Sequence, residues 1–137
     1  MESSAAGERE REAGRIVSLA PSATSTLTAM GAADRVVGVT AHCELDRPVV
    51  GGWLNPEWDR LADLDPDVVC TADGLQREIR DGLRDRGYDV CHVEPDRLDA
   101  VVDSVETLGR AVGRPAAGAS LAAELRGRVD AVRERTP

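Results

Sequence analysis

The chain has 137 residues, 42% of them hydrophobic, which suits one globular α/β domain built around a single core. All 17 basic residues are arginine, and 25 acidic residues give a net charge of −8 and a pI near 4.7. Such an acidic surface repels the phosphate backbone, which argues against a nucleic-acid partner. No apolar run approaches the roughly 18 residues that a membrane span requires.

Residues 1–14 are polar and charged, and we interpret them as a flexible leader. They contain no apolar segment of the kind found in a secretory signal. The sequence therefore predicts either a cytoplasmic protein or a chain that lacks its true N-terminus.

Strand-like apolar runs alternate with helical patterns from residue 15 onward. Strands are predicted at 16–19, 36–39, 68–71 and 88–93, and helices at 22–30, 55–64, 75–86, 98–112 and 116–135. This order predicts a four-stranded parallel, Rossmann-like sheet with helices on both faces.

Capping residues predict four of these boundaries. Ser22 is predicted to cap the first helix, and Asn55 the second, with Pro56 at its first helical position. Gly31 lies where a left-handed C-cap is expected after the first helix, and Gly87 is expected to close the third.

The domain organisation follows from the same pattern. We expect residues 15–114 to form an N-terminal α/β ligand-binding lobe and residues 115–137 to form a long helix that looks like a connector to a second lobe, which this chain does not contain. The apolar face of that helix needs a cover, so a homodimer through the helix is one expectation.

Ligands of parallel sheets bind beyond the carboxyl ends of the strands. The segments at that edge are residues 20–24, 40–55, 71–75 and 94–97. Trp53 follows Gly51 and Gly52 in the longest of them. Because aromatic residues make up only 2% of the chain, this ring either stacks on a large flat ligand or plugs the top of the sheet.

Other candidate residues have simpler interpretations. Amides at the helix start near Pro21, Ser22 and Ala23 can receive an anionic ligand group, although capping is the alternative role of Ser22. His42 lies in the long loop beside Cys43 and Glu44, but three adjacent ligands rarely achieve tetrahedral geometry, so no metal site is predicted.

The sequence offers no catalytic constellation. It contains no GxGxxG, GxxxxGK[ST], GxSxG or HExxH motif, and His92 is expected on a sheet face. Cys70 and Cys91 lie in apolar strand-like runs and are expected to be buried, reduced thiols. We therefore expect a binding protein and not an enzyme.

Several segments in order resemble one known family. The run from Arg15 to Thr24, reading RIVSLAPSAT, is similar to the opening of the helical-backbone substrate-binding proteins of ABC importers. Further similar segments are DRVVGVT at 34–40, the Gly51-Gly52 and Asn55-Pro56 pairs, LDPDVV at 64–69, and Leu108-Gly109 with Val112-Gly113-Arg114. Members of this family carry cobalamin, ferric siderophores or haem.

The resemblance implies two α/β lobes joined by a rigid helix, with a metal chelate held between them. It implies that Trp53 contacts a corrin ring and that Asp59 presents its carboxylate to arginines of the transporter permease. The expected ligand contacts are Pro21, Ser22, Ala23, His42, Trp53, Leu54 and Asn55.

The resemblance also implies an extracytoplasmic role in import of a cobalamin or other corrinoid, a ferric siderophore or haem. An intracellular corrinoid-binding or regulatory module is the first alternative, and the absence of a visible signal favours it. A flavodoxin-like enzyme or a bare interaction module is the second.

Overall fold

The structure is a computed structural model and describes residues 14–41, 45–94 and 98–135. Its main sheet contains β1 (Ile16–Ser18), β2 (Val36–Val39), β5 (Val68–Ala72) and β6 (Val90–Val93). The helices are α2 (Pro21–Ala29), α3 (Trp58–Leu64), α4 (Arg77–Asp85), α5 (Leu98–Ala111) and α6 (Pro115–Arg135). A small hairpin joins β3 (Gly51–Gly52) to β4 (Asn55–Pro56), and short 3-10 turns span Ala33–Arg35 and Gly74–Gln76.

The four strands of the main sheet run parallel in the order β2-β1-β5-β6, which confirms the predicted fold class. Ile16 of β1 pairs with Val36 on one side and with Val68 on the other. The chain winds from β1 to β2, then crosses back over β1 to reach β5. Its winding direction therefore reverses between β1 and β5, which are neighbours in the sheet.

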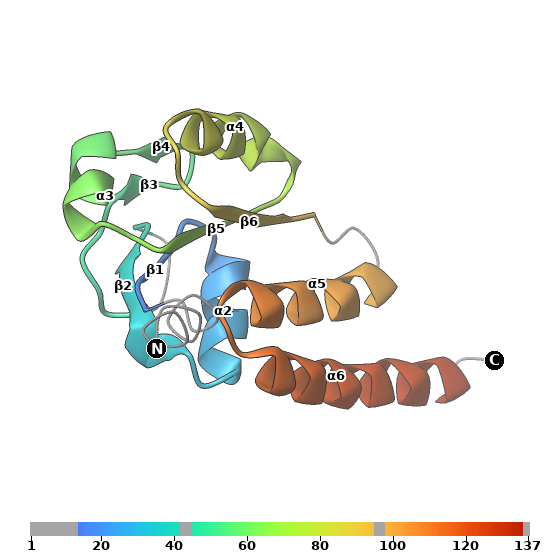
Figure 1. The fold of residues 1–137 in the computed structure, drawn as a ribbon. Helices are drawn as coiled ribbons and strands as arrows, with labels where there is room; N and C mark the ends of the chain where they lie inside the picture. The colour runs from blue at the N-terminus through green and yellow to red at the C-terminus, as the bar shows by residue number, and fades with distance from the viewer. Residues whose placement is uncertain (1–13, 42–44, 95–97, 136–137) are drawn as a thin grey trace.

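Helices cover both faces of the sheet, with α3 and α4 on one side and α2 and α5 on the other (Figure 1). Because successive side chains of a strand point to opposite faces, Ile16 and Val17 enter different cores. The core toward α2 and α5 includes Leu27 and Leu108, and the core toward α3 and α4 includes Leu61 and Leu83. Among the described residues, no helix is both long and apolar enough to cross a bilayer.

The predicted cap of the first helix was wrong. Ala20 occupies the N-cap position and Pro21 opens α2, so Ser22 already lies inside the first turn and caps nothing. Proline suits that position because it has no amide hydrogen to satisfy and its backbone is already helical. The far end agrees with the prediction, since Gly31 has a φ of 78° and ends the helix in the left-handed conformation.

The predicted start of the second helix was also wrong. Asn55 and Pro56 form β4 and pair with Gly52 and Gly51, and α3 begins only at Trp58, after Glu57. The cause is tertiary. Gly51 has a φ of 119°, and a side chain there would collide with the backbone of Asn55 and Glu57, so glycine lets the chain fold back on itself.

Cys70 and Cys91 are free and buried, as the sequence predicted. Cys70 and Cys91 lie side by side on β5 and β6, both unpaired by any disulfide and both buried. Burial raises the pKa of the Cys70 thiol far above its usual range and that of Cys91 to about 11. Cys43 lies outside the described residues.

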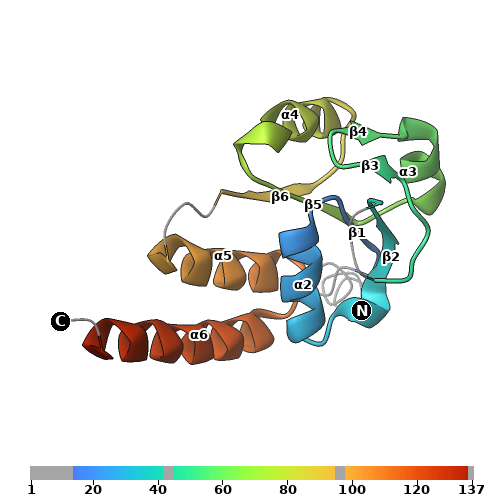
Figure 2. The same cartoon turned by 180° about the vertical axis from the view of Figure 1, so that it is seen from behind.

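Helices α5 and α6 pack along one another at the base of the molecule (Figure 2). Their backbones meet closely at Gly109 and Gly118, where a Cβ on Gly109 would stand 2.8 Å from the Cα of Gly118. Val105 and Ala122 bury their side chains in the same seam. Helix α6 is the long helix that the sequence predicted, and its role as a connector stays a prediction.

Replacing Gly109 by alanine is expected to lower the free energy of unfolding by about 1–3 kcal/mol, because backbone atoms on α6 must move aside. Gly127→Ala is the matched control, since nothing lies within 4 Å of a Cβ at that position of α6. It should raise stability by up to about 1 kcal/mol through helix propensity. Urea denaturation of both variants measures the difference, and equal effects would contradict the close packing.

Candidate functional site

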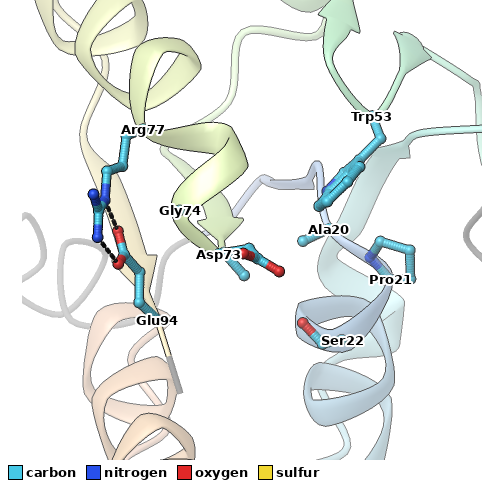
Figure 3. A pocket seen from close by; sticks show the side chains of 9 residues that line it. Ala20, Pro21, Ser22, Trp53, Asp73, Gly74, Arg77 and Glu94 are labelled. Carbon is cyan, nitrogen blue, oxygen red and sulfur yellow. Dashed lines mark hydrogen bonds and ion pairs between the residues drawn. The ribbon is translucent and has the colours of Figure 1, made fainter. Parts of the chain in front are cut away.

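A cavity of about 560 Å³ opens at the carboxyl ends of β1 and β5, where the winding of the sheet reverses. Parallel α/β sheets bind ligands at this location because the connecting loops diverge there. Nine residues line the cavity: Ala20, Pro21, Ser22, Trp53, Ala72, Asp73, Gly74, Arg77 and Glu94. Figure 3 shows Trp53 on one side and the Arg77–Glu94 pair across from it.

Three of the seven residues expected to contact a ligand line this cavity, namely Pro21, Ser22 and Trp53. The structure does not bring the other described ones there. Ala23 is only 1% exposed and packs into the core beneath α2, because its side chain lies on the buried face of that helix.

Leu54 and Asn55 are not among the lining residues either. Leu54 projects into solvent at 46% exposure, and Asn55 pairs with Gly52 in the hairpin. His42 lies outside the described residues. Asp59 is exposed in the first turn of α3, and Trp58 is partly buried against the core, as expected for it.

Trp53 lies at the turn of the β3–β4 hairpin, and its ring points toward Ala20 (Figure 3). The ring is partly buried, and its indole nitrogen Nε1 is enclosed without a hydrogen-bond partner in the described part of the chain. A buried indole donor normally finds a partner. Because the ring forms a wall of the cavity, it presents a flat apolar face to whatever occupies that space.

The opposite wall carries an ion pair with two parallel hydrogen bonds. Arg77, the first residue of α4, donates from Nε to Glu94 Oε2 at 2.6 Å and from Nη2 to Oε1 at 2.5 Å. Glu94 directly follows β6. This forked geometry uses both carboxylate oxygens, so it fixes the orientation of both side chains and neutralises the guanidinium.

A second partner holds Glu94 from within the sheet. His92 donates from Nε2 to Glu94 Oε2 at 2.8 Å, and its Nδ1 lies 2.7 Å from the Thr71 hydroxyl on β5. An ionised carboxylate only accepts, so Nε2 must carry a proton. The hydrogen bonds from Arg77 and His92 lower the pKa of Glu94 to about 2, so it is ionised at neutral pH.

Asp73 forms part of the floor between the two walls in a strained conformation. Its φ of 79° and ψ of 153° lie in a region that glycine alone adopts freely. Hydrogen bonds on both sides hold it there, from its own amide to Val93 O at 2.8 Å and from the Gln76 amide to its carbonyl at 3.2 Å. Figure 3 shows its carboxylate directed into the cavity.

The residues missed by sequence reasoning fall into two groups. Ala20, Ala72, Asp73, Gly74 and Glu94 lie in strand-end segments that the sequence marked as ligand edges, without being singled out. Arg77 lies beyond those segments. The pairing of Arg77 with Glu94 spans 17 residues, and no local pattern indicates it.

The described residues contain no group of three or more histidine, cysteine, aspartate or glutamate side chains placed to hold a metal ion. The tripeptide at 42–44 lies outside them. The cavity offers a ligand the apolar ring of Trp53, the ion pair of Arg77 with Glu94 and the exposed carboxylate of Asp73.

Comparison with known proteins places these features in a family. Residues 16–137 match the family model described as periplasmic binding protein. A cobalamin-binding protein of Halobacterium salinarum is 32% identical over 136 residues, which cover 93% of this chain and 37% of that protein. A vitamin B12-binding protein of Yersinia pestis is 26% identical over 128 residues, covering 88% and 45%. The chain thus spans less than half the length of these curated relatives.

Solved structures agree with the fold. The periplasmic vitamin B12-binding protein of Vibrio cholerae superposes with a TM-score of 0.81 and 27% identity, over 90% of this chain and 51% of that one. A periplasmic heme-binding protein from Roseiflexus sp. RS-1 gives a TM-score of 0.77 and 25% identity, over 89% and 49%. The first of these proteins is named for binding vitamin B12 and the second for binding heme.

The low pKa of Glu94 predicts a specific acid sensitivity. The hydrogen bonds from Arg77 and His92 lower the pKa of this carboxyl from 4.5 to about 2, so its stabilising contribution is complete above pH 4.5 and disappears as pH falls toward 2. The stability difference between the parent and Glu94→Gln should therefore shrink across that window. Urea denaturation at several pH values between 5.5 and 2.5 measures it, and a constant difference would show that the pair does not hold Glu94 ionised.

Proposed function

The chain belongs to the periplasmic binding protein family, and we propose that it forms the first ligand-binding lobe of a substrate-binding protein that delivers a corrinoid, such as cobalamin, to an ABC importer. The single observation that carries this proposal is the cavity with Trp53 on one wall. It lies where the fold receives ligands, and it offers a flat ring to a flat ligand. The names of the relatives from Halobacterium and Yersinia support a corrinoid.

The charge of the cavity supports the choice among flat metal chelates. Its lining holds two carboxylates, on Asp73 and Glu94, and one guanidinium, on Arg77, which Glu94 already neutralises. The lining therefore carries one excess negative charge. Cobalamin surrounds its ring with neutral amide arms, whose N–H groups donate to carboxylates, whereas haem carries two propionates that a negative lining repels.

Haem or a ferric siderophore is the second candidate. The heme-binding relative from Roseiflexus supports it, as does the start of α2, which borders the cavity at Pro21 and Ser22 and whose first-turn N–H groups, beginning with that of Ser22, have no acceptor within the helix. A helix N-terminus favours anionic groups such as propionates. A corrinoid would therefore be recognised mainly by the Trp53 ring and the carboxylates of the cavity. Haem or a ferric siderophore would be recognised mainly by the start of α2.

A transporter partner and a compartment complete the proposal. Asp59 is exposed on α3 and is the residue that we propose for docking to the permease. We propose an extracytoplasmic location, as the family description implies. An intracellular corrinoid-binding or regulatory module is the alternative, and fractionation of cells that produce the full-length protein separates the two. The comparisons do not support a homodimer through α6, and the proposal omits it.

Trp53→Ala tests the corrinoid site directly. We expect the parent to bind cyanocobalamin with a dissociation constant on the order of micromolar or weaker, because one lobe supplies part of the contacts. The variant should bind at least about ten-fold more weakly, since it loses the stacking surface. Equilibrium dialysis followed by corrinoid absorbance gives both constants without relying on tryptophan emission.

Trp58→Phe is the matched control for that experiment. Trp58 packs against the core beside α4, with the Arg86 guanidinium 3.7 Å above its ring, and it does not line the cavity. Its replacement should leave the affinity for cyanocobalamin unchanged. Equal affinity of the parent and Trp53→Ala would refute the site, and a folded parent that binds no corrinoid would refute the ligand.

Glu94→Gln tests the charge argument with two corrinoids of different charge, cyanocobalamin and cobyrinic acid. The corrin ring of cobyrinic acid carries carboxylates in place of amides. Removing the carboxylate exposes the charge of Arg77, so the ratio of the two affinities should shift about ten-fold toward the carboxylate ligand. Glu124→Gln on α6 is the control, because it removes the same charge far from the cavity lining. An unchanged ratio in Glu94→Gln would favour the helix start as the recognition element.

A further inference from the structure

Gln76 is the chain's single glutamine, and its side chain is fully buried at 0% exposure. It ends the 3-10 turn Gly74–Gln76 that follows β5. Few uncharged polar side chains are enclosed so completely, because an unsatisfied amide is costly inside a protein. The contacts that satisfy it therefore show what it does.

The carboxamide makes three hydrogen bonds, all to backbone. Its Oε1 accepts from the Ala72 amide at 2.9 Å. Its Nε2 donates to the Leu19 carbonyl at 2.9 Å and to the Trp53 carbonyl at 2.7 Å. Both amide hydrogens and the carbonyl oxygen are used, so the group is satisfied in this orientation and would not be after an amide flip.

These three backbone groups belong to three separate sides of the cavity. Leu19 directly precedes the lining residues at the start of α2, and Ala72 is itself a lining residue at the end of β5. Trp53 stands on the hairpin turn, which comes from a distant part of the sequence. One side chain thus joins the two strand ends to the turn that carries the aromatic wall.

We propose that Gln76 is a positioning residue of the ligand site, which fixes the Trp53 ring at the rim of the cavity and thereby sets the affinity for a flat ligand. The hairpin that carries Trp53 has only two paired residues in each strand, so it needs an external anchor. The part of the inference that concerns affinity rests on the proposed function. The part that concerns the placement of Trp53 does not.

The chemistry of the three contacts explains why glutamine is required. Glutamate has the same length but donates nothing when ionised, and it would face the carbonyls of Leu19 and Trp53 with a negative charge. Methionine matches the volume and removes all three of these hydrogen bonds. Both substitutions release the turn while changing the core packing very little.

The test uses the full chain with Trp58→Phe, so that Trp53 is the single tryptophan and reports its own surroundings. In this background, Gln76→Met and Gln76→Glu should shift Trp53 emission to longer wavelength and raise acrylamide quenching about two-fold or more, because the ring leaves its partly buried position. Affinity for cyanocobalamin should fall about ten-fold.

Gly109→Ala is the control for a general loss of stability, since it strains the α5–α6 seam away from the cavity. It should leave Trp53 emission, quenching and corrinoid affinity unchanged. A folded Gln76→Met whose Trp53 emission and quenching match the parent overturns the proposal. If Trp53 moves but the parent binds no corrinoid, the positioning role stands and the proposed ligand falls.

A measurement on the parent covers the case in which neither Gln76 variant folds. Because both Nε2 hydrogens are bonded in the interior, the Gln76 side-chain amide should exchange with deuterated water at least about ten-fold more slowly than a free carboxamide. Nuclear magnetic resonance of the nitrogen-labelled chain resolves this pair, since Asn55 supplies the one other side-chain carboxamide in the sequence. Rapid exchange of both hydrogens in the folded protein overturns the proposal.

Discussion

The site depends on the reversal of winding between two neighbouring parallel strands. From β1 the chain turns toward β2 through α2, and from β5 it turns toward β6 through α4, on the opposite face of the sheet. The two connections therefore diverge, and nothing in the sheet fills the space between their starting points. Residues 20–22 and 72–74 line that space. The location of the cavity follows from topology before any side chain is considered.

Topology alone gives an opening and no recognition surface. The two walls come from elements outside the β1–β5 pair, one from the β3–β4 hairpin and the other from α4 and the end of β6. Each wall is fixed by hydrogen bonds that cross between elements: Gln76 holds the turn of Trp53, and His92 with Arg77 holds Glu94. Walls held in place before a ligand arrives reduce the ordering cost of binding.

Much of this fold could be predicted from the sequence because buried parallel strands have a plain signature. Val68 and Val69 lie in a short apolar run that is buried on both faces, and regular helical spacing of apolar residues marked α5 and α6. Helix starts were less predictable. Ser22 and Asn55 have good capping chemistry, but Pro21 and the fold-back at Gly51 move each start, and neither effect is visible in a local window.

Some residues of the candidate site could likewise be predicted from the sequence, and others could not. Trp53 was predictable because aromatic residues are scarce and the loop lies at a strand end, so a single residue could be weighed by itself. Arg77 and Glu94 could not be distinguished among 17 arginines and 25 acidic residues, because their significance is a pairing between the start of α4 and the end of β6. Gln76 left a signal that composition alone shows, since it is the single glutamine in a chain whose other polar positions favour charge.

Two features of the cavity lining lower the stability of the folded protein. Asp73 adopts a backbone conformation that costs about 1–3 kcal/mol for a residue with a side chain, and the Trp53 indole nitrogen is enclosed without a partner in the described chain. Both features lie on the lining. In the cores on either side of the sheet, the largest fully buried side chains are leucine, isoleucine and valine, apart from Gln76. These aliphatic side chains have no polar atom to leave without a partner. The strained backbone of Asp73 and the unmet donor of Trp53 meet at one opening, and features of this kind are typical of a surface selected for contact with a ligand rather than for folding.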